Sequence, residues 1–84
     1  MKLYQIRTED KNFNKIQELL NVAFDGYTIN SCFGSWKRQL EASLVIEILT
    51  DDKELVYAVA EKIKELNDQE SVLVIELPCD FDFV

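Results

Sequence analysis

The chain has 84 residues, of which 48% are apolar and 30% are charged. This composition fits one globular domain with a modest core and excludes a disordered chain. No apolar run approaches the ~20 residues needed to span a bilayer, and the first residues lack the apolar stretch of a signal peptide. We therefore expect one cytoplasmic domain over residues 1–84 that does not enter a membrane.

The net charge of −7 is distributed unevenly. Residues 1–42 carry a net charge of +1, whereas residues 43–84 carry −8. Nucleic-acid phosphates are bound by clustered Lys and Arg, so we predict no direct binding to nucleic acid. A partner protein with a basic or apolar surface fits this charge better.

The first elements are a short strand and a helix. Residues 3–6 alternate between apolar and polar side chains, and apolar residues then recur at steps of three and four. We predict a helix over residues 10–24, capped by the side-chain oxygen of Thr8 or Asp10. Gly26 is expected to take the left-handed conformation that ends the helix.

A change to a period of two predicts a long β-hairpin. Residues 27–36 and 40–49 alternate, with only Lys37, Arg38 and Gln39 as a polar break. Arms of about ten residues would extend ~33 Å, so we expect part of the hairpin to project beyond the domain body. Leu44 and Ile46 are expected to lie in the core.

A second helix is predicted over residues 52–66, opening at Asp51 with Glu54 three residues later. Its core stripe includes Val59 and Ile63. The apolar run at residues 72–75 predicts a buried strand, and Pro78 is expected to end its pairing. Residues 78–84 then form a C-terminal tail or an edge strand.

This order of elements predicts an α+β, ferredoxin-like βαββαβ fold. Right-handed crossovers give a four-stranded antiparallel sheet of order 4-1-3-2 with both helices on one face. The residues expected to face the helices are Leu44, Ile46, Ile48, Tyr27, Ile29, Leu73 and Ile75. The residues expected on the opposite face are Thr28, Asn30, Cys32, Trp36, Glu41, Ser43, Val45, Glu47, Val72, Val74 and Glu76.

The sequence contains no histidine, which removes the commonest general base and metal ligand. Glu41 and Glu47 lie six residues apart on one strand face, about 20 Å, and cannot act as a pair. Cys32 and Cys79 form no metal-binding spacing and are expected to be free thiols. We predict a protein that is not an enzyme and has no catalytic residue, cofactor or metal site.

Exposed aromatic residues indicate binding surfaces. Trp36 either contacts a partner or folds over its own hairpin tip, and the tail phenylalanines pair with an edge of this chain or of a neighbour. The residues predicted for an interface are Trp36, Val45, Val72, Val74, Phe81 and Phe83. The residues predicted for a small-ligand site are Trp36, Glu41 and Ser43. Because helices cover only one sheet face, we expect a homo-oligomer.

The segments Gly26-Tyr27-Thr28-Ile29, Gly34-Ser35-Trp36 and 41–48, followed by a helix, resemble small βαββαβ proteins of the PII-like and CutA-like kind. The resemblance implies a compact trimer, an outward hairpin, and binding of a small ligand, a metal or a target protein. The Lys- and Arg-rich nucleotide-binding segments of PII proteins have no counterpart here. The resemblance therefore implies the architecture and oligomerisation of that group.

Three functions follow from these observations. The first is a non-enzymatic regulatory module that binds or inhibits a partner protein. The second is a PII-like sensor of a small ligand or metal. The third is an acidic inhibitor of the phage or plasmid type, in which carboxylates of residues 43–84 mimic nucleic-acid phosphates.

Overall fold

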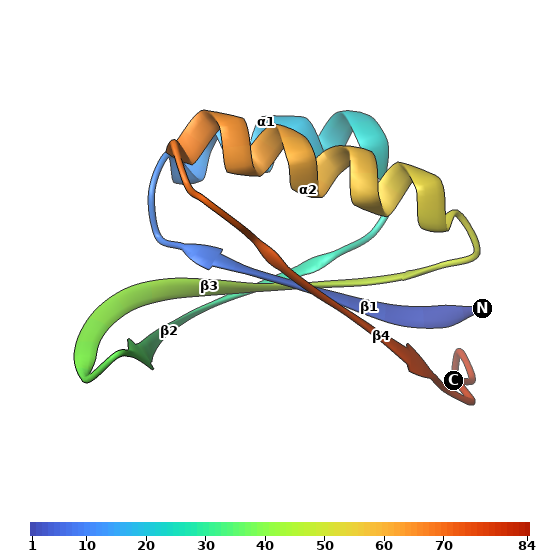
Figure 1. Ribbon diagram of the computed structural model, residues 1–84. Coiled ribbons are helices and arrows are strands. Elements are labelled where there is room, and N and C mark those ends of the chain that lie inside the picture. Colours follow the sequence, from blue (N-terminus) through green and yellow to red (C-terminus); the bar gives the residue numbers. More distant parts are fainter.

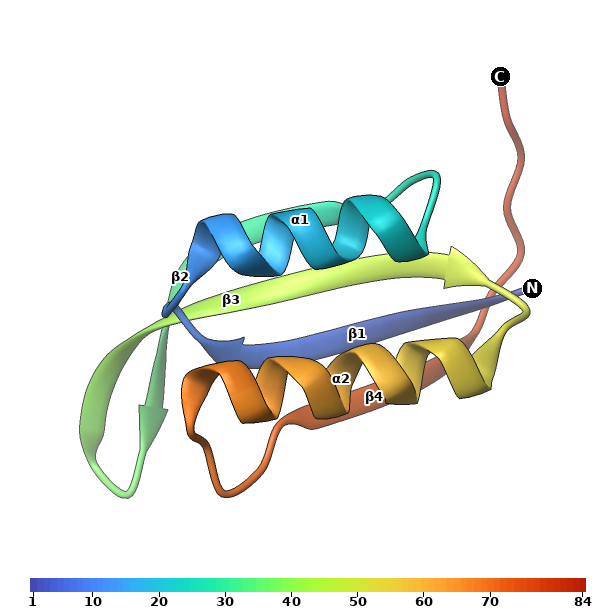
Figure 2. The same ribbon diagram turned by 90° about the horizontal axis from the view of Figure 1, so that it is seen from above.

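The computed structural model describes all 84 residues, and its strands form one antiparallel sheet with two helices on one face (Figures 1 and 2). The elements are β1 (Lys2–Glu9), α1 (Phe13–Ala23), β2 (Thr28–Trp36), β3 (Gln39–Thr50), α2 (Lys53–Asn67) and β4 (Leu73–Pro78). The strand order is β2-β3-β1-β4. This is the predicted order read from the other edge, so the predicted α+β fold is confirmed.

The core lies between the helices and the central strands β1 and β3. Its buried side chains come from alternate strand positions and from one stripe of each helix: Tyr4, Ile6, Ile16, Leu20, Leu44, Ile46, Ile48, Val56, Val59, Ala60 and Ile63. The alternation follows from the two-residue period of a strand, and the stripe follows from 3.6 residues per helical turn. The predicted core residues Leu44, Ile46, Val59 and Ile63 are confirmed.

The β2–β3 hairpin is long and closes with a two-residue turn. Pairing runs from Thr28 opposite Glu47 to Trp36 opposite Gln39. The turn residues Lys37 and Arg38 have φ of 50° and 66°, the left-handed pair that a type I′ turn requires. Figure 1 shows the end of the hairpin curving away beyond the helices, as predicted.

The helix ends differ from the predictions in three places. Thr8 and Asp10 do not cap α1, because Thr8 still belongs to β1 and the helix begins after Asn12, which has φ of 56°. Gly26 does not end α1; the helix stops at Ala23 because the next residue, Phe24, is extended. The cap of α2 is Asp52, one residue later than predicted, and its carboxylate accepts a hydrogen bond from the Leu55 amide at 3.0 Å.

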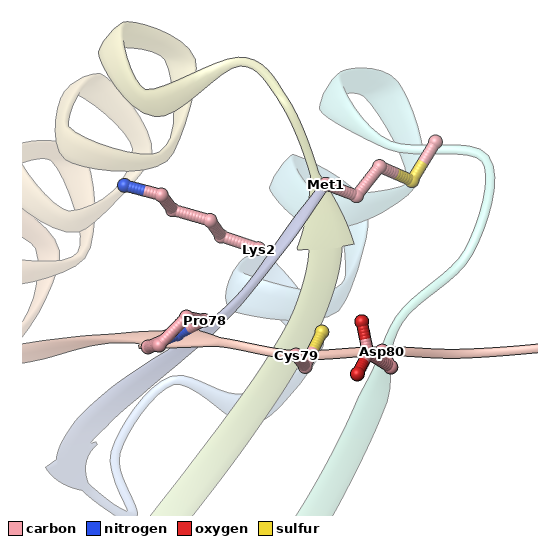
Figure 3. Close-up of a pocket in the computed structure, with 5 residues that line it drawn as sticks. All are labelled: Met1, Lys2, Pro78, Cys79 and Asp80. Carbon is pink, nitrogen blue, oxygen red and sulfur yellow. The ribbon is translucent and has the colours of Figure 1, made fainter.

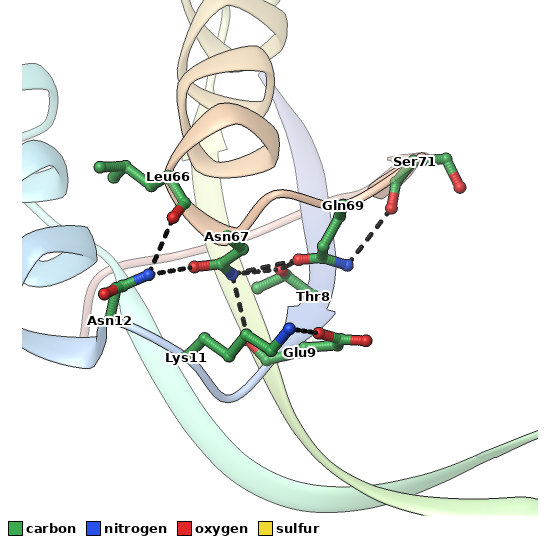
Figure 4. A network of polar contacts seen from close by, with 8 residues as sticks. All are labelled: Thr8, Glu9, Lys11, Asn12, Leu66, Asn67, Gln69 and Ser71. Carbon is green, nitrogen blue, oxygen red and sulfur yellow. Dashed lines mark hydrogen bonds and ion pairs between the residues drawn. The ribbon is translucent and has the colours of Figure 1, made fainter.

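A polar network made by Thr8, Asn12, Asn67 and Gln69 joins the ends of β1 and α2 to the start of α1 (Figure 4). Buried Asn67 donates through Nδ2 to Thr8 Oγ1 and Gln69 Oε1, both at 3.1 Å. Asn12 donates to the carbonyl of Leu66 at 2.9 Å, which satisfies one of the unpaired carbonyls at the end of α2. Thr8 thus holds elements together, which explains why it does not cap α1.

The predicted orientation of β4 is wrong. Val72 and Val74 pack against the core, and Leu73 is 55% exposed. The pairing agrees, because Val74 lies opposite buried Ile6 whereas Ile75 lies opposite Gln5. Since a strand presents successive side chains to opposite faces, the odd-numbered residues of β4 occupy the face away from the helices.

Candidate functional site

The sheet face away from the helices, called here the open face, carries a row of leucines at one end. Leu3 of β1 lies opposite Leu49 of β3 and Leu77 of β4. Two rows further along, Arg7 lies between Val45 and Leu73. Figure 1 shows no helix or strand covering this face. Apolar side chains gathered on an uncovered sheet face are typical of a contact surface.

The polar groups in the middle of the open face bind one another. Arg7 Nη2 donates to Gln5 Oε1 at 3.3 Å, and Gln5 Nε2 donates to Glu47 Oε2 at 3.1 Å. Glu47 therefore has a partner in its own chain. The predicted placement of Glu76 on this face is wrong, because Glu76 lies opposite Tyr4, on the helix side of the sheet. Neither Glu47 nor Glu76 would therefore become an unpaired buried charge if another molecule covered the open face.

The predicted interface residues divide between several places in the structure. Val45 lies on the open face, and Trp36 lies at the hairpin tip. Val72 and Val74 contact the core, so their predicted placement on an exposed surface is wrong. The residues of β4 that sequence reasoning missed are Leu73, Ile75 and Leu77. Because every position of residues 72–75 is apolar, the sequence shows no alternation there that would tell which set faces outward.

The hairpin tip combines exposed apolar groups with positive charge. The exposed fractions are 74% for Phe33, 69% for Trp36 and 74% for Leu40. Lys37 Nζ lies 6.0 Å from the centroid of the Trp36 ring, a cation–π distance. Trp36 thus lies beside its sequence neighbour Lys37 and still exposes most of its surface.

The predicted ligand-site residues Trp36, Glu41 and Ser43 share one face of the hairpin. Glu41 lies opposite Gly34, the strand position between Trp36 and Cys32. The Ser43 hydroxyl donates weakly to the Glu41 backbone carbonyl at 3.4 Å and not to its carboxylate. A Cβ added at Gly34 would lie 3.0 Å from Ser43 Oγ, so glycine keeps this close approach free of strain.

Residues 79–84 leave β4 as an irregular tail and join no strand. Phe81 and Phe83 stack edge to face at 5.6 Å between ring centroids, yet they remain 46% and 84% exposed. None of the backbone hydrogen bonds outside the helices and strands involves residues 79–84. The tail therefore offers unpaired backbone groups and two exposed rings.

The two cysteines lie at opposite edges of the sheet. Cys32 lies in edge strand β2, and Cys79 follows edge strand β4. Three strand spacings separate these edges by about 14 Å, whereas bonded cysteines have Cα atoms within about 7 Å. Both thiols are free in this chain.

A cluster of charges occupies the helix side of the sheet at the start of β1. Glu76 accepts from Lys2 Nζ at 2.5 Å and lies 3.2 Å from Lys53 Nζ. The hydrogen bonds from Lys2 and Lys53 lower the pKa of Glu76, and the bond to Glu76 raises the pKa of Lys2. Burial raises the pKa of neighbouring Tyr4. Two cations explain how an acidic residue is accommodated on the helix side.

A shallow pocket of about 290 Å³ lies beside this cluster. Its lining residues are Met1, Lys2, Pro78, Cys79 and Asp80 (Figure 3). In Figure 3 the Lys2 ammonium points away from Asp80, so these polar groups do not converge on one ligand atom.

The structure has no group of three or more Cys, Asp or Glu side chains arranged to hold a metal ion. Neither helix has the length and apolar character needed to cross a bilayer.

Many solved structures have a similar fold, including the following two. A DUF3240 family protein from Shewanella baltica OS155 superposes with a TM-score of 0.74 and 10% identity, over 99% of this chain and 93% of that chain. CPII, a nitrogen regulatory PII-like protein from Thiomonas intermedia K12 solved with ADP, AMP and bicarbonate, superposes with a TM-score of 0.63 and 23% identity, over 95% of this chain and 94% of that chain.

The predicted resemblance to PII-like proteins is confirmed at the level of fold. No protein-family profile matches the sequence, and no curated protein matches it by sequence. At identities of 10% and 23% the two structures establish a shared architecture over nearly the whole chain. A shared architecture does not by itself determine function, which depends on the surfaces of this chain.

Proposed function

We propose that this protein is a small, non-enzymatic regulatory module that associates with itself through the open face and binds a partner protein with its hairpin tip. The observation that supports the proposal most strongly is the tip itself. It exposes Phe33, Trp36 and Leu40 at the end of a hairpin that extends beyond the helices. Binding hot spots are enriched in tryptophan, tyrosine and arginine, and the tip supplies Trp36 and Arg38.

The turn at the tip supports a binding role independently of exposure. Type I′ turns favour Asn-Gly, yet this chain places Lys37 and Arg38 at the two left-handed positions. Side chains with a Cβ are strained there. Backbone strain is often found at functional sites. We therefore attribute the presence of the two cations at these positions to contact with a binding partner.

The open face supports self-association. Its leucine row at Leu3, Leu49 and Leu77 provides apolar area, and the hydrogen-bonded chain from Arg7 to Glu47 brings its polar groups already paired. Burying such a face leaves few polar groups without partners. The PII-like architecture of the chain agrees with use as a regulatory subunit.

The charge of the tip revises the expected partner. Residues 27–40 include two cations and no acidic residue, whereas the rest of the chain carries seven cations and 16 acids. The overall charge had predicted a basic or apolar partner surface. The tip favours an apolar surface that also carries carboxylates.

Affinity capture from the native host, followed by mass spectrometry, tests this role. The Trp36→Ala, Lys37→Gln, Arg38→Gln triple variant should lose the proteins that the wild type retains. The matched control is Lys15→Gln with Lys62→Gln, which removes two exposed cations from the helices and should retain them. Equal recovery by the wild type and the tip variant would refute a binding role for the tip.

A small-ligand sensor is the second candidate, because CPII was solved with ADP, AMP and bicarbonate and has this fold. The hairpin face with Trp36, Glu41 and Ser43 is the site that the sequence predicts for it. A thermal-shift screen with nucleotides, bicarbonate and divalent metals separates the two candidates. A saturable rise in melting temperature that Glu41→Gln abolishes would favour the sensor.

A further inference from the structure

We infer that the C-terminal tail of one copy, residues 79–84, binds the hairpin tip of a second copy and so occupies the proposed partner site. The inference rests on the proposed function of the tip and specifies the chemistry of its ligand, a segment in which acidic and aromatic residues alternate. The two segments are complementary in charge, in exposed side chains and in unpaired backbone.

Charge complementarity is the first argument. The tail contains Asp80 and Asp82 and no cation, and the tip contains Lys37 and Arg38 and no acid. Both cations belong to the turn, where no intrachain ion pair holds either of them. Because the rest of the chain carries seven cations and 16 acids, the tip is a place where an acidic segment meets an attractive field.

The apolar groups of the two segments match as well. Phe81 and Phe83 of the tail are partly or largely exposed, and Trp36 and Phe33 of the tip expose most of their surface. Aromatic pairs gain about 0.5–1.5 kcal/mol beyond the area that they bury. Because Trp36 and Phe33 lie on opposite faces of the hairpin, a tail bound on the Trp36 face would remove three exposed aromatic rings from water, those of Trp36, Phe81 and Phe83.

Backbone pairing is available to both partners. β2 is an edge strand, so one side of residues 28–36 has unpaired amide and carbonyl groups. The tail makes no backbone hydrogen bonds with the sheet, so its amide and carbonyl groups are also free to pair. Addition of a strand to a free edge is a recurrent mode of peptide recognition.

The distance between the tail and the tip of one chain is too great for an intramolecular contact. Pro78, Lys2 and Thr50 lie in one row across the sheet, and Gln39, the residue of β3 next to the turn, lies eleven residues before Thr50. Eleven residues of strand span about 36 Å, whereas six residues of tail reach about 20 Å. Figures 1 and 2 both place the C-terminus and the hairpin tip at opposite ends of the molecule. A tail therefore reaches the tip of another copy and not its own.

Trp36 is the only tryptophan in the chain, so its fluorescence reports on the tip directly. In the wild type, dilution should shift Trp36 emission to longer wavelength as tails dissociate. Two full-length charge-reversal variants test the pairing: Lys37→Glu with Arg38→Glu, and Asp80→Lys with Asp82→Lys. Each variant alone opposes like charges, so we expect its half-transition concentration to rise by about tenfold.

Mixing the two variants is the decisive test of pairing between tail and tip. The reversed tip of one variant then meets the reversed tail of the other, and the unaltered tip and tail also remain complementary. The mixture should regain the wild-type transition to within about threefold, a difference of about 0.7 kcal/mol. Lys15→Glu with Lys62→Glu makes the same change of charge on the helices and should leave Trp36 emission as in the wild type.

Trp36 emission that does not respond to dilution would overturn the inference, and so would a mixture that behaves as the sum of its two components. Loss of captured proteins from the tip variant, combined with an unresponsive Trp36, would refute the tail contact while leaving the proposed function intact. Far-UV circular dichroism of each variant confirms that the fold is retained.

Discussion

Replacing Lys37-Arg38 by Asn-Gly should stabilise the protein while removing the proposed binding function of the hairpin. The two turn residues have φ of 50° and 66°. Asn tolerates this conformation better than Lys does, and Gly adopts it without steric cost. The substitution therefore relieves strain in the folded state without altering any core contact.

The expected gain follows from the backbone alone. A left-handed conformation costs an ordinary residue roughly 1–2 kcal/mol, and two such residues stand in the turn. The greater conformational freedom of Gly stabilises the unfolded chain and so reduces this gain by about 0.5–1 kcal/mol. Asn relieves only part of the strain at position 37. The net stabilisation is about 1 kcal/mol, which raises the melting temperature of a domain of this size by about 4–8 °C.

Thermal and urea unfolding followed by circular dichroism measure this change. Lys37→Gln with Arg38→Gln is the matched control, because it removes the same two charges and keeps a Cβ at both positions. The control should leave the melting temperature within the error of the wild type. A destabilised Asn-Gly variant, or an equal gain in the control, would refute the argument from turn strain.

Three further changes test the core, the polar network and the charge cluster. Ile46→Ala removes a fully buried side chain from a central strand and should lower the free energy of unfolding by about 2–5 kcal/mol in urea denaturation. Asn67→Ala leaves the Thr8 hydroxyl and nearby carbonyls without their donor, so we expect a loss of about 1–3 kcal/mol, whereas Asn67→Asp should recover none of it. The pKa of Glu76 is lowered in the folded protein, so Glu76 stabilises the fold above its ordinary pKa of 4.5 and loses this effect as pH falls through the lowered value. Glu76→Gln should therefore be less stable than the wild type at pH 7 and equal to it in strong acid; a constant difference across pH would contradict this assignment.

The elements that the sequence predicted well are those whose pattern is unambiguous. In β3, Leu44, Ile46 and Ile48 alternate with side chains that include Ser43 and Glu47, so the buried face could be read directly. The helices show one apolar stripe each for the same reason. The polar break at Lys37, Arg38 and Gln39 marked the turn because it interrupts two alternating runs, although Gln39 itself pairs with Trp36 in the hairpin.

The orientation of β4 could not be read in this way. Residues 72–75 are all apolar, so their period of two is hidden, and Glu76 suggested the outward face. Its true placement depends on Lys2 and Lys53, which lie far away in the sequence and neutralise it on the helix side. The open face was therefore predicted with Val72 and Val74 in place of Leu73 and Ile75.

The helix ends were mispredicted because long-range contacts determine them. Thr8 resembles an N-cap by its position before the helix, but its hydroxyl bonds with Asn67 and Gln69 at the far end of α2. Asn12 then starts the helix in a left-handed conformation while its side chain bonds to Leu66. No local pattern announces such contacts.

Sedimentation equilibrium at micromolar concentration tests the central claim most directly, because self-association through the open face underlies the proposed regulatory role. We predict a mass that is a multiple of the 9.8 kDa chain. Leu73→Gln with Leu77→Gln, at positions 55% and 40% exposed on the open face, should reduce this mass toward that of the monomer. Val22→Gln, at an 89% exposed position on α1, should leave it unchanged. A wild-type protein that sediments as a monomer of 9.8 kDa, or an oligomer that the open-face substitutions do not weaken, would contradict the account.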